Sequence, residues 1–509
     1  MNRLTVRLPI LISIIVLSSS PTQPQERKPG DLRIEPSVFK AANGETVEAE
    51  SGVLVVLENR SRPGSRLIEL AFMRLKSRNS KPGVPILYLV GGPGGQAIAQ
   101  VRMFFPQYSN LLEAGDLILL DQRGTGTSNP NLNCIEKLNY PLDKPLEREE
   151  LLRMIKEASL ACARAWREKG VDLEAYNTLE NAADVEALRE ALKIDRLNLF
   201  GTSYGTHLAL AVIRRYGAHL NRVILAGIEG PDHTYKLPSQ IDQNFAEIAA
   251  LVRADSKIGN DMPDLLGAIR AIASRLEKEP AAVELPDPAT QRKVKIVVGR
   301  FDFQLFLAIF PGRVARIKML PATLDRMMQG DFTALAQFSL AARREPTGSA
   351  MSFMMDCSSS ASAERWERIK REEKDSLAGA VIDFPFPDVC EAWNAPDLGS
   401  AFRSPVESSV PILFISGGLD GRTPASNAEE VRRGFPNSHH LIVENAGHVD
   451  ATMFTTKTKE VMVDFLLGKP VTIDKIPAPP LEFMPLKKNE NPMKRIQRPE
   501  RIGVERPEG

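Results

Sequence analysis

The segment LNLFGTSYGTHLALAVI, residues 197–213, decides the fold of this chain. An apolar run, 197–200, leads into Gly-Thr-Ser-Tyr-Gly, and an apolar, helix-like stretch follows directly. The order is strand, sharp turn, helix. A G-x-S-x-G turn in this setting is a nucleophile elbow, which holds the hydroxyl of a strained serine above the sheet. The segment therefore predicts an α/β fold in which Ser203 makes and breaks acyl bonds.

Two later strand ends supply the partners that a nucleophilic serine needs. The apolar run 411–415 ends in glycines and delivers Asp420 to the next loop, and the run 440–444 leads into the loop that carries His448. Serine, acid, histidine is the chain order of an α/β-hydrolase triad. We expect His448 to act as general base, oriented by Asp420. The alternative for Asp420 is a turn aspartate that caps the helix after Pro424.

Only six histidines are available as the base. His207 lies in the helix after the elbow and should point into packing. His233 could line the pocket, but no acid partner is recognisable for it. The remaining three fall at a helix end or a strand start: His219, His439 and His440. The sequence therefore favours His448.

A glycine loop, 91–95, follows the apolar run 86–90. Such a loop exposes backbone N–H groups, and we expect those of Gly92 and Tyr204 to form an oxyanion hole. A phosphate-binding loop is the alternative, but neither the P-loop lysine pattern nor G-x-G-x-x-G is present. The next strand ends in Asp-Gln-Arg-Gly, 121–124, and we interpret its acid–arginine pair as a brace for the glycine loop.

Together these motifs resemble the prolyl iminopeptidase and tripeptidyl aminopeptidase branch of the α/β-hydrolases, over about residues 45–468. The resemblance implies a mostly parallel central sheet flanked by helices, with a large helical cap inserted between nucleophile and acid. It implies a secreted serine exopeptidase that removes one or a few residues from the free N-terminus of small peptides. Prolyl iminopeptidases usually carry histidine before the glycine loop. Val90 stands there in this chain, so the tripeptidyl aminopeptidase branch fits better.

An aminopeptidase must bind the substrate ammonium, which requires a carboxylate near Ser203. Glu229 is the first candidate because it follows strand 222–226 at the edge where the catalytic loops emerge, and Asp232 is the second. The alternative for Glu229 is an ion pair with Arg123 or with an arginine of the cap. The nearest alternative function is a carboxylesterase or lipase with the same triad, and a more distant one is a noncatalytic binding protein.

The spacing of the triad indicates the domain organisation, because far more residues separate Ser203 from Asp420 than one strand–helix unit needs. We expect a first core part at 45–231, a cap at 232–404, a second core part at 405–468, and a Pro-rich extended or disordered tail at 469–509. Runs 54–57 and 67–72 predict an antiparallel strand pair before the parallel strands.

Periodicity predicts a mostly helical cap. Apolar residues recur three and four positions apart in 241–253, 265–276, 314–328 and 332–342. Six methionines could line a pliable pocket in the cap, although core packing is the commoner use of this residue. They are Met319, Met327, Met328, Met351, Met354 and Met355.

Composition fits a large globular enzyme, with 43% hydrophobic and 25% charged residues. A net charge of +1 favours neither a nucleic-acid partner nor stable membrane association. No H-E-x-x-H or C-x-x-C spacing is present, so we expect neither a metal nor a cofactor. The oligomeric state stays open.

The N-terminus is typical of an export signal, with Arg3 and Arg7 ahead of an apolar segment, 8–17, and three serines. About ten apolar residues are too few to span a bilayer. We expect a signal peptide over 1–22 and a periplasmic or extracellular protein, an uncleaved anchor being the alternative.

Export permits disulfides, and the four cysteines could pair in three ways. Pairing neighbours in sequence is the simplest choice, and it joins Cys134 to Cys162 and Cys357 to Cys390. Four reduced, buried cysteines are the alternative if the protein is not exported.

Overall fold

The computed structural model describes residues 27–344, 348–451 and 455–486. Its centre is a sheet with strand order β1-β2-β3-β5-β4-β6-β7-β10-β11-β12. These strands are β1 (Leu32–Lys40), β2 (Thr46–Leu57), β3 (Leu67–Leu75), β4 (Ile86–Leu89), β5 (Leu117–Leu120), β6 (Leu197–Thr202), β7 (Leu220–Ala226), β10 (Ile412–Gly417), β11 (Ser438–Val443) and β12 (Lys475–Ile476). From β5 to β12 all neighbours are parallel, so the expected mostly parallel sheet is present.

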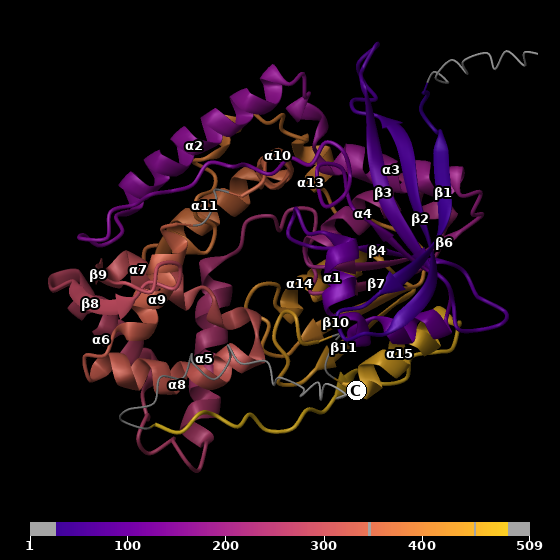
Figure 1. Cartoon of the computed structure of the whole chain (residues 1–509). Helices are drawn as coiled ribbons and strands as arrows, with labels where there is room; N and C mark the ends of the chain where they lie inside the picture. The colour runs from indigo at the N-terminus through magenta and orange to yellow at the C-terminus, as the bar shows by residue number, and fades with distance from the viewer. Residues whose placement is uncertain (1–26, 345–347, 452–454, 487–509) are drawn as a thin grey trace, which may run out of the picture.

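The strands of the parallel part are apolar because both faces of the sheet are covered. One face packs on α3 (Thr178–Ala191), α4 (Tyr204–Tyr216) and α14 (Ala425–Val431), and the other on α1 (Ala97–Met103) and α15 (Thr456–Leu466). Figure 1 shows this layered half of the molecule. Parallel strands end at one edge, so the loops after β4, β6, β10 and β11 meet there.

The antiparallel start of the sheet is longer than the expected pair. β2 and β3 contain the two predicted runs and pair antiparallel, and β1 pairs with β2 outside them. We did not predict β1, because this edge strand is mostly exposed and contains Pro36, and so lacks an apolar alternation.

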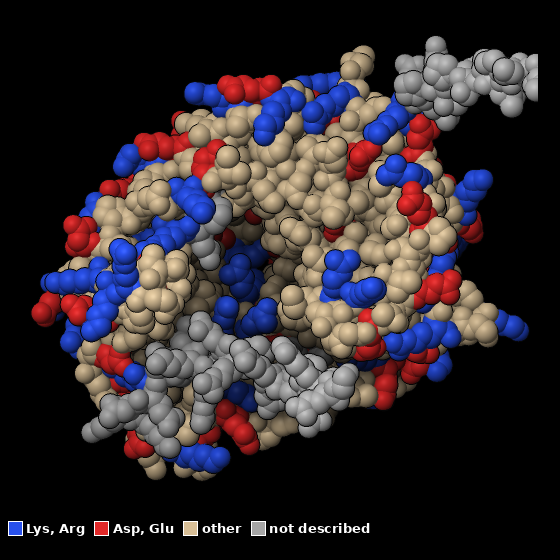
Figure 2. All heavy atoms as spheres, in the orientation of Figure 1, with Lys and Arg blue, Asp and Glu red and all other residues tan. Residues whose placement is uncertain are grey.

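Residues 227–411, between β7 and β10, form the insertion. The four predicted helices are present as α5 (Pro238–Ala254), α6 (Leu265–Lys278), α8 (Val314–Met328) and α9 (Thr333–Ala342). The other helices are α7 (Arg300–Leu307), α10 (Ala350–Ser359), α11 (Ala363–Glu372), α12 (Cys390–Trp393) and α13 (Gly399–Arg403). A hairpin, β8 (Ala281–Pro286) with β9 (Lys293–Val298), was not predicted. Figure 2 shows a hollow between the two halves, with Lys and Arg side chains inside it.

The methionines of the insertion serve packing. Five of the six are buried in the interior, and Met328 is exposed at the end of α8. None of them lines the cavity beside Ser203, which is described below. Core packing, the commoner use of methionine, is therefore confirmed for these five residues.

The segment after α15 joins the two halves of the molecule. β12 extends the sheet beside β11, and the chain then crosses to the insertion, where Leu481 and Phe483 are buried (Figure 1). The Met484 N–H donates to the Lys318 carbonyl at 2.9 Å. Up to residue 486 the predicted tail is thus an ordered, mostly extended segment that packs on both halves through apolar side chains.

Both disulfides have the predicted pairing. Cys134–Cys162 ties the loop after the Asp121 motif to α2 (Arg148–Glu168), and Cys357–Cys390 joins α10 to α12. The predicted signal peptide, 1–22, lies outside the described residues. Within the part of the chain that the structure describes, every helix is too short or too polar to cross a bilayer.

Candidate active site

Ser203 lies between β6 and α4 with φ 54° and ψ −128°, a strained conformation for a residue with a side chain. Close packing explains the glycines around it. A Cβ at Gly205 would lie 1.9 Å from the Leu89 carbonyl oxygen, and one at Gly201 would lie 2.6 Å from the Gly205 oxygen. The elbow therefore needs glycine for the approach of its backbone to β4, and Ser203 itself makes the sharp turn.

The structure brings the three predicted triad residues into contact. His448 Nε2 lies 3.0 Å from Ser203 Oγ, and His448 Nδ1 lies 2.9 Å from Asp420 Oδ2. Gly227, with φ 63°, leaves room for the ring, since a Cβ there would lie 3.0 Å from His448 Cε1. Three strand ends, β6, β10 and β11, thus converge on one hydrogen-bonded chain.

Asp420 is buried and serves two roles. Its Oδ1 accepts hydrogen bonds from the N–H groups of Arg422 and Thr423, as expected for a turn aspartate, while its Oδ2 faces His448. Burial works to raise the pKa of Asp420, but the His448 ring and the hydrogen bonds from Thr423 outweigh it and lower that pKa. The two interpretations of Asp420 are compatible, and its carboxylate is held ionised.

The other histidines have different partners. His207 contacts the Gly230 carbonyl and Ser359 Oγ, and burial lowers its pKa. His233 Nε2 lies 3.0 Å from Glu430 Oε1, an acid partner that the sequence did not reveal because it comes from α14. The other three also bond elsewhere: His219 to Glu186, His439 to the Ile473 carbonyl, and His440 to Glu429 and Ser416.

Gly92 and Tyr204 offer free backbone donors. Gly92 lines the same cavity as Ser203, and a Cβ at Gly91 would lie 2.7 Å from Ser203 Cβ and 3.3 Å from the Tyr204 nitrogen. Neither the Gly92 nor the Tyr204 N–H donates a hydrogen bond to another described residue. Both groups are therefore available to a developing oxyanion beside Ser203.

The brace on the glycine loop involves one member of the predicted pair, Asp121, together with Gln122 in place of Arg123. Gln122 Nε2 donates to the Val90 carbonyl, and Asp121 Oδ1 accepts from the Ile98 N–H, so these two side chains hold both ends of the loop. The buried Arg123 instead forms a bidentate ion pair with Asp184. The interpretation of Arg123 as a brace was wrong, because its guanidinium points toward α3.

A cavity of about 160 Å³ adjoins Ser203 and takes residues from both halves of the molecule. Gly92, Ser203 and Thr423 come from the sheet loops. Its remaining walls come mainly from the insertion and are rich in charge and in aromatic rings: Glu229, Thr234, Tyr235, Lys236, Asp356, Ile382, Asp383, Phe384 and Phe386, with Arg422 from the Asp420 loop. The polar residues that face Ser203 suit a small charged ligand.

The two predicted ammonium-binding acids are already engaged. Glu229 does line the cavity, but its carboxylate accepts a 2.6 Å bond from Lys236 Nζ, so its partner is a lysine and neither Arg123 nor an arginine of the insertion. Asp232 lies outside the cavity lining and binds Ser362, the residue that caps α11. Glu229 therefore lines the cavity as predicted, but Lys236 neutralises its charge. Asp232 does not line the cavity, and its contact with Ser362 is structural.

Two carboxylates that the sequence did not reveal face the cavity with less compensation. Asp356 makes no side-chain hydrogen bond or ion pair with a described residue. Asp383 Oδ1 accepts from the Lys236 N–H at 2.7 Å, while its buried Oδ2 has no partner. Lys236 Nζ is fully occupied by Glu229 and by two carbonyl oxygens. The cavity therefore holds carboxylate oxygens that no lysine or arginine side chain of the described residues contacts directly.

Burial governs the protonation of these two acids. It raises the pKa of Asp383 to about 7, with Lys236 and Arg422 acting in the opposite direction. Burial, with the nearby Glu229 charge, raises the pKa of Asp356 well above its usual range. A cation placed between them would favour their ionised forms.

Comparison with known proteins places these observations in a family. The family model described as the alpha/beta hydrolase fold matches residues 84–451. A tripeptidyl aminopeptidase of Streptomyces coelicolor is 24% identical, with 78% of this chain and 77% of that protein covered. A putative hydrolase of Escherichia coli is 28% identical, with 75% and 77% covered. A proline iminopeptidase of Arabidopsis thaliana is 27% identical over 39% of this chain and 44% of its own.

The family match covers well over half of the chain and includes the elbow, Asp420 and His448. It agrees with the sheet order, with the loops that meet at one sheet edge, and with the helical insertion between the serine and the acid. This chain belongs to the α/β-hydrolase family.

Proposed function

We propose that this protein is a serine exopeptidase that releases one or a few residues from the free N-terminus of small peptides through an acyl-enzyme. The observation that carries the proposal is the cavity in which a Ser–His–Asp chain faces two carboxylates, Asp356 and Asp383, that have no ion-pair partner among the described residues. Relatives named tripeptidyl aminopeptidase and proline iminopeptidase support it. An esterase needs the same triad but has no use for an anionic pocket.

The triad supplies the nucleophile. His448 Nε2 takes the hydroxyl proton as Ser203 Oγ attacks the scissile carbonyl carbon, and Asp420 stabilises the imidazolium that forms. The carbonyl oxygen becomes an oxyanion, and the Gly92 and Tyr204 N–H groups are placed to donate to it. His448 then protonates the leaving amine, and the C–N bond breaks to give the acyl-enzyme.

Water completes the cycle. His448 takes a proton from a water molecule, the resulting hydroxide adds to the acyl carbon, and the same donors hold the second oxyanion. Collapse returns the proton from His448 to Ser203 Oγ and releases the N-terminal fragment as a free acid. Every proton that leaves Ser203 or water thus passes through one imidazole.

The cavity supplies the ammonium site. Glu229 is neutralised by Lys236, so we assign the substrate ammonium to Asp356 and Asp383. Charge-assisted hydrogen bonds to these buried acids would hold the substrate N-terminus at a fixed distance from Ser203. That distance would make the enzyme an exopeptidase, since an internal peptide bond carries no ammonium to place there.

Export is part of the same proposal. Two disulfides support it, because disulfides persist mainly in oxidising compartments. N-terminal sequencing of protein recovered from outside the cytoplasm tests it, with the expected chain beginning after residue 22. A chain that remains in the cytoplasm and begins at Met1 would contradict export.

Replacement of Ser203 by alanine should lower peptide hydrolysis by about 10⁴-fold or more and abolish labelling by a fluorophosphonate. Ser416→Ala is the matched control, because Ser416 also contacts a histidine but is completely buried. The control should keep most of its activity, and both variants should keep the thermal unfolding midpoint near that of the parent. Retained hydrolysis in Ser203→Ala would reject the nucleophile.

A substrate panel should separate the exopeptidase from the esterase. N-acetylation of an otherwise identical peptide amide removes the ammonium, and we expect kcat/KM to fall by about 10- to 100-fold, the value of one charge-assisted hydrogen bond. Asp356→Asn should remove most of this difference. Cleavage of simple aryl esters without any cleavage of aminoacyl or tripeptidyl amides would mean that the exopeptidase assignment is wrong.

The KM for free-ammonium peptides should depend on pH through Asp383. Its carboxyl is ionised above a pKa of about 7 and protonated below it, and only the ionised form attracts an ammonium. KM should therefore rise by up to about tenfold for each pH unit below 7, while the substrate amine, with a pKa of about 7.7–8.0, stays charged. Steady-state kinetics from pH 5.5 to 7 with a neutral ester as reference measures this. Asp383→Asn should make the profile shallower, and the remaining slope should come from Asp356, whose pKa is also raised. A KM that is constant across this range would exclude the role of Asp383.

A further inference from the structure

The Cys357–Cys390 disulfide lies directly behind the acidic walls of the cavity. Cys357 follows Asp356 in α10, and Cys390 begins α12 directly after the segment that contains Asp383, Phe384 and Phe386. The two walls that supply Asp356 and Asp383 are therefore joined by one covalent bond.

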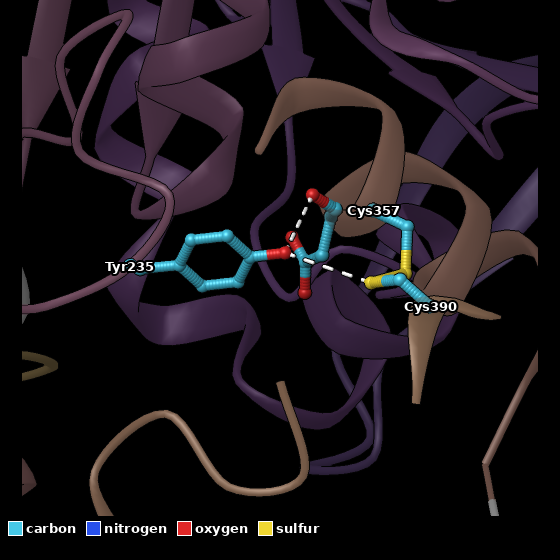
Figure 3. Close-up of a disulfide and its surroundings, with 4 residues drawn as sticks. Tyr235, Cys357 and Cys390 are labelled. Carbon is cyan, nitrogen blue, oxygen red and sulfur yellow. Dashed lines mark hydrogen bonds between the residues drawn. A yellow bond between two sulfur atoms is a disulfide. The ribbon is translucent and has the colours of Figure 1, made fainter. Parts of the chain in front are cut away.

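Tyr235 connects this disulfide to the cavity. Its hydroxyl donates to the Asp356 carbonyl oxygen at 3.3 Å and lies 3.7 Å from Cys390 Sγ, as Figure 3 shows. Its ring packs on Trp366 and Phe386 at centroid distances of 4.5 and 5.7 Å. Tyr235 also lines the cavity, so it touches both tied segments and the substrate space.

Asp356 depends on its backbone for its position. Its carboxylate has no hydrogen bond or ion pair within the described residues, so no side-chain partner holds it against the cavity. A carboxylate in such a place is poorly solvated and would move toward water if the end of α10 were released. The covalent tie and the Tyr235 hydrogen bond link this end of α10 to the walls of the cavity. Bonds of Ser359 to Thr178, His207 and Arg403 also hold the helix end.

We propose that the Cys357–Cys390 disulfide, together with Tyr235, is a positioning device that fixes Asp356 and Asp383 for the substrate ammonium. It acts on substrate recognition and leaves the serine chemistry untouched, because the triad residues stand on loops of the sheet. This inference rests on the proposed exopeptidase function.

The double variant Cys357→Ser with Cys390→Ser tests the device, and Cys134→Ser with Cys162→Ser is its matched control. The control removes the other disulfide, whose cysteines lie outside the cavity lining. Each variant is assayed with a free-ammonium peptide amide, with its N-acetylated form, and for its rate of fluorophosphonate labelling. Loss of the first tie should raise KM for the free peptide by about tenfold or more, as expected for one misplaced charge-assisted bond.

Labelling and hydrolysis of the acetylated peptide should stay close to the parent values in both double variants, and KM should stay unchanged in the control. Tyr235→Phe, which keeps the ring and loses the hydroxyl, should raise KM in the same direction by a smaller factor. It decides the question if the cysteine variant does not fold.

An unchanged KM in the Cys357/Cys390 variant, or a parallel fall in labelling and in peptide cleavage, would overturn the positioning role. Equal effects of the two double variants would do the same. A parent enzyme that cleaves esters but no free-ammonium peptide would instead overturn the proposed function, so the two failures are distinguishable.

Discussion

The close approach between the elbow and the end of β4 is the constraint on which the site depends. Gly205 lies so near the Leu89 carbonyl that any side chain there would collide with it, and a Cβ at Gly91 would lie only 2.7 Å from Ser203 Cβ. This packing accompanies the strained turn of Ser203 and brings the glycine loop close to Ser203 and to the Tyr204 nitrogen. The serine and the backbone donors that we propose for the oxyanion are thus positioned by backbone contact, which a mobile side chain could not provide as rigidly.

The sequence was informative where function follows from strand ends. Ser203, Asp420 and His448 could be predicted because apolar runs mark buried strands, and parallel strands bring their carboxyl ends together whatever the separation along the chain. The insertion behaved differently. Its helices follow from periodicity, but the partner of Glu229 and the placement of Asp356 and Asp383 depend on how those helices and loops pack, and no local pattern encodes that.

The sheet half contains a second hydrogen-bonded serine–histidine–acid group, so such a geometry does not by itself identify a catalytic triad. Glu429, His440 and Ser416 form a second acid–histidine–serine chain, with contacts of 2.5 and 3.0 Å. Ser416 is fully buried within β10, so no substrate carbonyl could reach its hydroxyl. Ser203 differs because it adjoins a cavity and has unused backbone donors beside it. Access and oxyanion stabilisation distinguish a catalytic chain from a structural one.

The ammonium site that we propose and the triad lie in different halves of the molecule, and contacts between the halves keep the two sites aligned. The acids that we assign to the ammonium belong to the insertion, while the triad belongs to the sheet loops, so the reaction requires a fixed distance between them. Direct bonds maintain it: Asn244 of α5 donates to the Leu419 carbonyl, and the Val449 N–H donates to Gly312.

Asp450 adds a further link between the halves, since its carboxylate accepts from the N–H groups of both Val314 and Gly447. These bonds reach the Asp420 loop and the His448 loop separately. A displacement of α5 or of residues 312–314 would therefore strain the triad loops, whereas these bonds do not involve α10 or α12. The anchorage at these two places keeps the ammonium pocket that we propose aligned with a serine held by the sheet.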